Sequence, residues 1–73
     1  MTVKEAIKVI VGKNNNNLTI HTLDLKKEVW KLLENRKPMD STITRKMRNL
    51  RTEGYEVTCL SHKESLYRIK FID

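Results

Sequence analysis

The sequence has very little cysteine and no long apolar run, and each shortage excludes a class of protein. Cys59 is the only cysteine in 73 residues, so an internal disulfide framework is impossible and a reducing compartment is expected. No segment approaches the roughly 18 apolar residues that span a bilayer, and no basic region followed by an apolar run opens the chain. We therefore expect a soluble, unexported protein of the cytoplasm, associated with a nucleoid or a nucleus.

Residues suited to catalysis or metal binding are also scarce. His21, His62 and Cys59 lie far apart in the sequence and lack the short spacing that metal ligands show. The two glycines form no phosphate-binding loop, and no Ser-His-Asp or Cys-His set is present. We expect no enzymatic activity, no metal and no other cofactor.

Positive charge is abundant and concentrated. The net charge is +6, and residues 26–51 contain nine basic and three acidic residues, so this segment holds the whole excess. The remaining residues balance six basic against six acidic side chains. Such a block favours an anionic partner, with nucleic acid first, an acidic protein second and an anionic membrane surface third.

The length of the chain predicts one domain. The first half of the sequence shows the patterns of a helix, a strand and a second helix. Residues 2–12 have one apolar stripe, with Thr2 and Glu5 as a capping box and Gly12 as the stop. An asparagine-rich loop leads to a short strand at 18–22. A second helix is predicted at 23–35, with Thr22 as its cap and Asp24 in its first turn. Its apolar face consists of Leu25, Val29, Leu32 and Leu33, and its outer side of Lys26, Lys27, Lys31 and Glu34.

The second half predicts a third helix and a hairpin. Residues 41–53 bury Ile43, Met47 and Leu50, with Asp40 or Ser41 as the cap and Gly54 as the stop. Alternating apolar residues on both sides of "SHKES" predict a β-hairpin at 55–72 with a loop of about five residues.

The segment "STITRKMRNLRTEGYEV" at 41–57 resembles the recognition helix of winged helix-turn-helix DNA-binding domains. In that family a Ser-rich start, an Arg in the second turn and a Leu precede a Glu-Gly-aromatic step into the wing. The "LYRI" at 66–69 resembles the strand that returns from the wing. The resemblance covers about residues 2–72 and implies an α+β fold over 1–73 with three helices, a short strand after the first helix and a C-terminal hairpin wing.

The residues themselves allow the DNA contacts that this resemblance implies. A helix fits a B-DNA major groove if its outward face carries hydrogen-bond donors, and the third helix meets this condition. The expected groove-facing residues are Ser41, Thr42, Thr44, Arg45, Arg48 and Asn49. The expected phosphate contacts are Lys26, Lys27, Lys31, Arg36, Lys37, Lys46 and Arg51. The expected contacts from the wing tip are His62 and Lys63.

The sequence therefore predicts sequence-specific binding of double-stranded DNA by a small transcriptional regulator or a replication or recombination accessory protein. Two alternatives remain open, namely a protein-interaction module that docks an acidic partner and an RNA-binding domain. Trp30 lies off the main apolar face, where it either covers the core edge against the first helix or the hairpin, or contacts a partner. A homodimer through Trp30 or the first helix is one such arrangement. Abundant lysine and asparagine would fit a virus or mobile element with an AT-rich genome.

Overall fold

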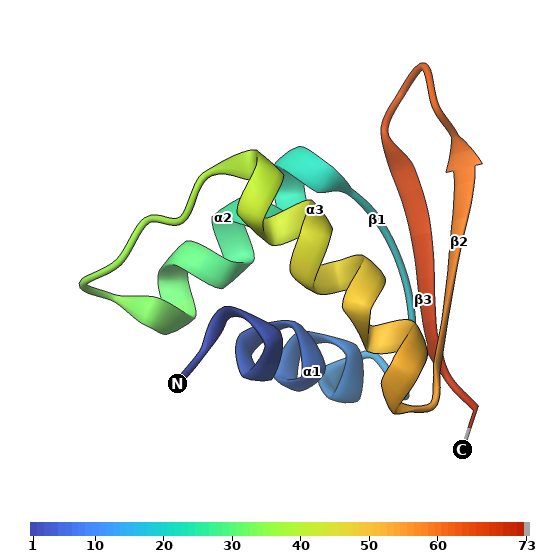
Figure 1. Cartoon of the computed structure of the whole chain (residues 1–73), viewed down its shortest axis with the longest axis horizontal. Helices are drawn as coiled ribbons and strands as arrows, with labels where there is room; N and C mark the ends of the chain where they lie inside the picture. Colours follow the sequence, from blue (N-terminus) through green and yellow to red (C-terminus); the bar gives the residue numbers. More distant parts are fainter. Residues whose placement is uncertain (73) are drawn as a thin grey trace.

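The computed structural model describes residues 1–72, in which three helices cover one face of a three-stranded antiparallel sheet (Figure 1). The helices are α1 (Val3–Lys13), α2 (Thr22–Leu33) and α3 (Asp40–Asn49), and α3 continues into the 3-10 turn η1 (Leu50–Glu53). The strands are β1 (Asn17–His21), β2 (Tyr55–Ser61) and β3 (Leu66–Phe71). The predicted α+β class and the predicted order of elements are confirmed, while Asp73 lies outside the described residues.

The strands pair in the order β1-β3-β2, so the short strand after α1 lies beside the returning strand of the hairpin. Leu18 and Val57 both pair with Ile69, which gathers three buried side chains on the helix-covered face of the sheet. The hairpin β2–β3 projects beyond the helices at one end (Figure 1). A bulge between Cys59 and Ser61 interrupts its register before the turn.

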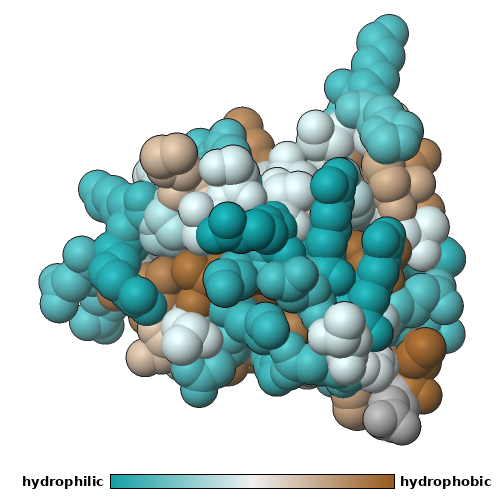
Figure 2. All heavy atoms as spheres, viewed as in Figure 1, coloured by the Kyte–Doolittle hydropathy of each residue, from teal (hydrophilic) through white to brown (hydrophobic). Residues whose placement is uncertain are grey.

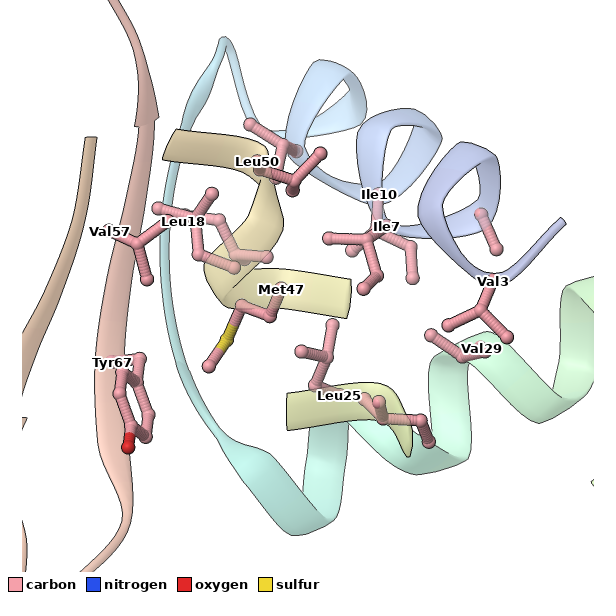
Figure 3. Close-up of a cluster of buried hydrophobic side chains, with 14 of the residues drawn as sticks. Val3, Ile7, Ile10, Leu18, Leu25, Val29, Met47, Leu50, Val57 and Tyr67 are labelled. Carbon is pink, nitrogen blue, oxygen red and sulfur yellow. The ribbon is translucent and has the colours of Figure 1, made fainter. Parts of the chain in front are cut away.

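The core lies where α1, α2 and α3 meet the inner face of the sheet. The core includes Ile43, Met47 and Leu50 and the whole predicted α1 stripe, which consists of Val3, Ala6, Ile7, Ile10 and Val11. Figure 3 shows Met47 in the space between Leu25 of α2 and Tyr67 of β3. Helices with one apolar stripe gain most of their stability from burying that stripe against the rest of the protein. The helix periodicity of the sequence therefore predicts which residues form the core.

The first helix begins as predicted and ends later than predicted. Glu5 donates its backbone N–H to the Thr2 hydroxyl, and the Glu5 carboxylate accepts the Thr2 N–H at 2.9 Å, so the capping box is confirmed. The hydrogen bonds lower the pKa of the Glu5 carboxyl. Gly12 is not the stop, because α1 continues to Lys13 and Asn14 caps it. The chain then reverses through Asn15 and Asn16, both at positive φ, a conformation that asparagine tolerates.

The predicted caps of the other two helices are wrong. Thr22 is already the first residue of α2, and His21 precedes it as the N-cap. The β1–β3 ladder continues up to the Thr22 N–H, which donates to the Ser65 carbonyl, so the chain enters α2 directly from the strand. Met39, in extended conformation, precedes α3, and neither Asp40 nor Ser41 caps it. The Asp40 carboxylate instead pairs with the Lys26 ammonium of α2.

The second and third helices also end differently from the prediction. Helix α2 stops at Leu33, two residues early, where Glu34 adopts φ 51° and turns the chain. The helical segment that starts at α3 does extend to residue 53, but its last four residues form η1. Gly54 follows at φ 87°, which confirms its role as the stop. Within residues 1–72, none of the helices combines the length and the apolar character needed to cross a bilayer.

An ion-pair cluster joins the end of η1 to α1. The Glu53 carboxylate pairs with the Lys4 ammonium at 2.8 Å and also accepts from Lys8. Hydrogen bonds from Lys4 and then Lys8 lower the pKa of the Glu53 carboxyl, and its bond raises the pKa of Lys8. The cluster joins the C-terminal end of the third helical segment to the first helix.

Candidate functional site

The outward side of α3 is polar and exposed. Helix α3 is anchored inward by Ile43 and Met47, and η1 by Leu50. This orientation leaves the opposite side to solvent, where the exposed residues are Ser41, Arg45, Arg48 and Asn49. Thr42 and Thr44 are half-buried. Figure 2 shows hydrophilic side chains gathered over the middle of this face, which we call the α3 face and define by the four exposed residues.

An open groove of ≈ 650 Å³ runs along the α3 face. It brings together five of the six residues predicted to face DNA, namely Ser41, Thr44, Arg45, Arg48 and Asn49. Thr42 does not line it. Sequence reasoning missed three lining residues: Thr22 at the start of α2, Asp40 at the start of α3 and Ser65 at the end of the hairpin turn. Only the pairing of β1 with β3 brings Thr22 and Ser65 together, and helix periodicity carries no such signal.

The two arginines of the α3 face differ in their surroundings. Arg48 donates from Nη2 to the Tyr67 hydroxyl of β3 over 3.4 Å, which is a long hydrogen bond. Arg45 makes no hydrogen bond or ion pair with the described residues. Its planar guanidinium therefore has its full set of donors available to a ligand.

Asp40 is the one acidic residue that lines the groove, and its charge is compensated. Its carboxylate lies 2.9 Å from the Lys26 ammonium of α2, and the Lys26 side chain is only 19% exposed. Lys26 also lies over the Trp30 ring, 5.1 Å from its centroid. The prediction that Lys26 points away from the body of the protein is thus wrong, because the lysine links α2 to the start of α3.

Two predicted phosphate contacts use their guanidinium groups within the chain. Arg51 donates from both Nε and Nη2 to the Val57 carbonyl of β2, at 3.2 and 2.7 Å. Arg36 donates to the Met1 carbonyl. Because both arginines are exposed side chains that reach back to backbone, periodicity alone could not distinguish them from free cations.

The predicted phosphate-contacting lysines are divided among different surfaces. Lys46 is half-buried on α3 itself. Lys27 and Lys31 line a second groove with Ile20 and Trp30, and this groove shares no lining residue with the one along α3. Lys37 follows α2 and lies over the Trp30 ring at 5.7 Å.

Trp30 holds the turn between α2 and α3. Its indole N–H donates to the Pro38 carbonyl at 3.0 Å, while Lys26 and Lys37 lie over the ring. The sequence left Trp30 either at the core edge against the first helix or the hairpin, or at a partner surface. The contacts named here are instead with Pro38 and Lys37 of the turn and with Lys26 of α2 itself. Cation–π contact and the hydrogen bond give the ring a structural role in setting the start of α3.

His62 and Lys63 are exposed in the four-residue turn 62–65, at the projecting end of the hairpin. The turn is one residue shorter than predicted, because β2 extends through Ser61. The Thr22 N–H donates to the Ser65 carbonyl at 2.9 Å, which fixes the turn beside the start of α2. Figure 2 shows this projecting end as hydrophilic.

The α3 face offers hydroxyl, amide and guanidinium groups for an anionic or hydrogen-bonding ligand. Among residues 1–72, no group of three His, Cys, Asp or Glu side chains is arranged to hold a metal ion. Comparisons with protein-family models, curated proteins and solved structures find no match to this chain.

Proposed function

We propose that this protein is a winged helix-turn-helix domain that binds double-stranded DNA in a sequence-specific manner, with α3 in the major groove. The observation that carries the proposal is the α3 face itself, because its two arginines are exposed while Ile43 and Met47 anchor the other side of the same helix. The order of elements and the hairpin beside the start of α2 support the winged-helix assignment.

The dimensions of α3 suit a major groove. An α-helix is roughly 10–12 Å across, and the major groove of B-DNA is about 12 Å wide. The groove-lining side chains of α3 come from successive turns of the helix, so they can meet successive base pairs. Arg45 can donate two hydrogen bonds to guanine and Asn49 can pair with adenine, while Ser41 and Thr44 adapt to a base or a phosphate.

Backbone contacts would complete the interface. Lys46 on α3 and Lys63 on the hairpin turn belong to the two elements that flank the groove, and His62 lies next to Lys63. Such contacts position the protein without reading sequence. A small protein of this kind fits a transcriptional regulator or an accessory factor in replication or recombination.

Titration of a random-sequence duplex at two or more salt concentrations tests the proposal. If about five phosphates are contacted, the logarithm of the affinity is expected to fall against the logarithm of the salt concentration with a slope of about −4.5, because each neutralised phosphate releases counterions. A structured RNA of equal length is the competitor. Stronger binding to the RNA, or no duplex binding at about 100 μM protein and low salt, where non-specific DNA binding is expected to be measurable, would contradict the proposal.

A further inference from the structure

The two edge strands of the sheet differ in whether side chains bond their outward backbone groups. At the β2 edge, Arg51 donates twice to the outward carbonyl of Val57 and so covers the middle of the strand. At the β1 edge, no side chain of residues 1–72 bonds the outward backbone of Thr19. Proteins commonly protect an edge strand with charge or proline, and Asn17–His21 contains neither.

The register shows which backbone groups of β1 point outward. The Phe71 N–H donates to the Asn16 carbonyl and the Thr22 N–H donates to the Ser65 carbonyl, so the even-numbered residues face β3. Neighbouring residues of an antiparallel strand alternate in direction, and Thr19 therefore turns both its N–H and its C=O away from the sheet. Asn17 and His21 turn outward in the same way.

Two of these outward groups are already engaged. The Asn17 N–H donates to the Asn14 carbonyl at 3.2 Å. The His21 carbonyl precedes α2 as its N-cap, where it accepts the first bond of the helix. The edge therefore offers two donors, the N–H groups of Thr19 and His21, and two acceptors, the C=O groups of Asn17 and Thr19.

This pattern is complementary to itself. When a second β1 runs antiparallel with Thr19 opposite Thr19, Asn17 lies opposite His21 of the other copy. The two Thr19 residues then exchange two hydrogen bonds, and each free His21 N–H meets a free Asn17 carbonyl. The two engaged groups also fall opposite each other, so two donors on each of two edges give four bonds and leave no group unpaired.

The surroundings of the edge also admit a second copy. Ile20 and Leu32 are only partly buried and line a groove beside β1, so apolar surface is available for burial. Lys13, Lys31 and Glu28 line the same groove, so its charged residues are two positive and one negative. The groove therefore carries a net charge of +1, a small part of the +6 of the whole chain.

We propose that the chain forms a twofold-symmetric homodimer through antiparallel pairing of β1 with β1 about Thr19, which joins the two sheets into one. A twofold interface uses the same surface on both copies, as this edge does. The interface is centred on the β1 backbone rather than on Trp30 or α1, although Ile10 and Lys13 of α1 line the adjacent groove. It does not depend on the proposed DNA binding.

Sedimentation equilibrium of the whole protein without DNA, from micromolar to millimolar concentration, tests the dimer. Thr19→Pro removes the Thr19 N–H in both copies, which is two of the four bonds, and leaves the β1–β3 ladder intact. We expect dimerisation at least about thirtyfold weaker, whereas Thr19→Val keeps the backbone donor and is expected to dimerise normally.

A charge swap gives an independent readout. Two Thr19→Lys chains would place like charges directly opposite each other, as would two Thr19→Glu chains, so each variant alone is expected to be mainly monomeric. An equal mixture is expected to form heterodimers. Because Thr19 lies opposite Arg68 on β3, the unfolding temperature of each variant is measured to confirm that it is folded.

Two results would overturn the proposal. One is a wild-type protein that stays monomeric up to millimolar concentration. The β1 edge would then face solvent or bind an extended segment of another protein. The other is a dimer that is unaffected by all three disruptive Thr19 variants while they remain folded, as expected if Trp30 or α1 formed the interface.

Discussion

Replacing Arg45 with alanine is expected to weaken binding to the preferred duplex by about 1–3 kcal/mol and to relax the preference at one base position. Arg45 is exposed on α3 and makes no hydrogen bond or ion pair with the described residues, so its donors are available to a base edge. A bidentate contact with guanine is the commonest specific contact of this kind. Selection from a random duplex pool, followed by titration of the selected site and a scrambled one, measures both effects.

Two control variants separate base recognition from simple charge. Arg45→Lys keeps the charge but loses the planar fork, so scrambled duplex is expected to bind normally while the preferred site loses its advantage. Lys31→Ala removes one positive charge from an exposed side chain that lines the groove beside Trp30, away from the α3 face. Equal losses from Arg45→Ala and Lys31→Ala on both duplexes would show that Arg45 contributes only charge.

Replacing Met47 with alanine is expected to reduce the free energy of unfolding by about 2–5 kcal/mol. Met47 is fully buried and lies between Leu25 and Tyr67, so truncation removes contacts to both α2 and the sheet (Figure 3). In a chain of this size such a loss is a large part of the total stability. Urea unfolding followed by circular dichroism gives the value.

Met39→Ala is the matched control, because the same atoms are removed from a side chain that is 69% exposed. Its expected effect lies within about 0.5 kcal/mol. Similar losses for the two methionines would contradict the assignment of Met47 to the core and, with it, the orientation of α3.

The order of elements was predictable because it rests on local patterns. Helix periodicity identified the stripes that α1 and α3 bury, and alternation identified the hairpin. The same periodicity placed Arg45 and Arg48 on the outer side of α3, where the structure has them exposed. These features depend on residues within a few positions of each other, and the sequence displays them directly.

The errors arose where distant segments compete for the same groups. Thr22 and Asp40 carry good capping side chains, but the sheet ladder extends to Thr22, and Lys26 takes the Asp40 carboxylate. Arg51 has the pattern of an exposed cation, yet β2 returns beside it and accepts its donors at Val57. Such outcomes depend on how the elements pack, which no local pattern reports.

Mapping of backbone amide chemical shifts during titration with a short duplex reports which surface of the folded protein meets DNA. We expect the largest changes in residues 40–49 and in the turn 62–65, with α1 little affected. Changes confined to α1 or to the groove beside Trp30, with α3 unaltered, would show that the protein does not meet DNA through the α3 face.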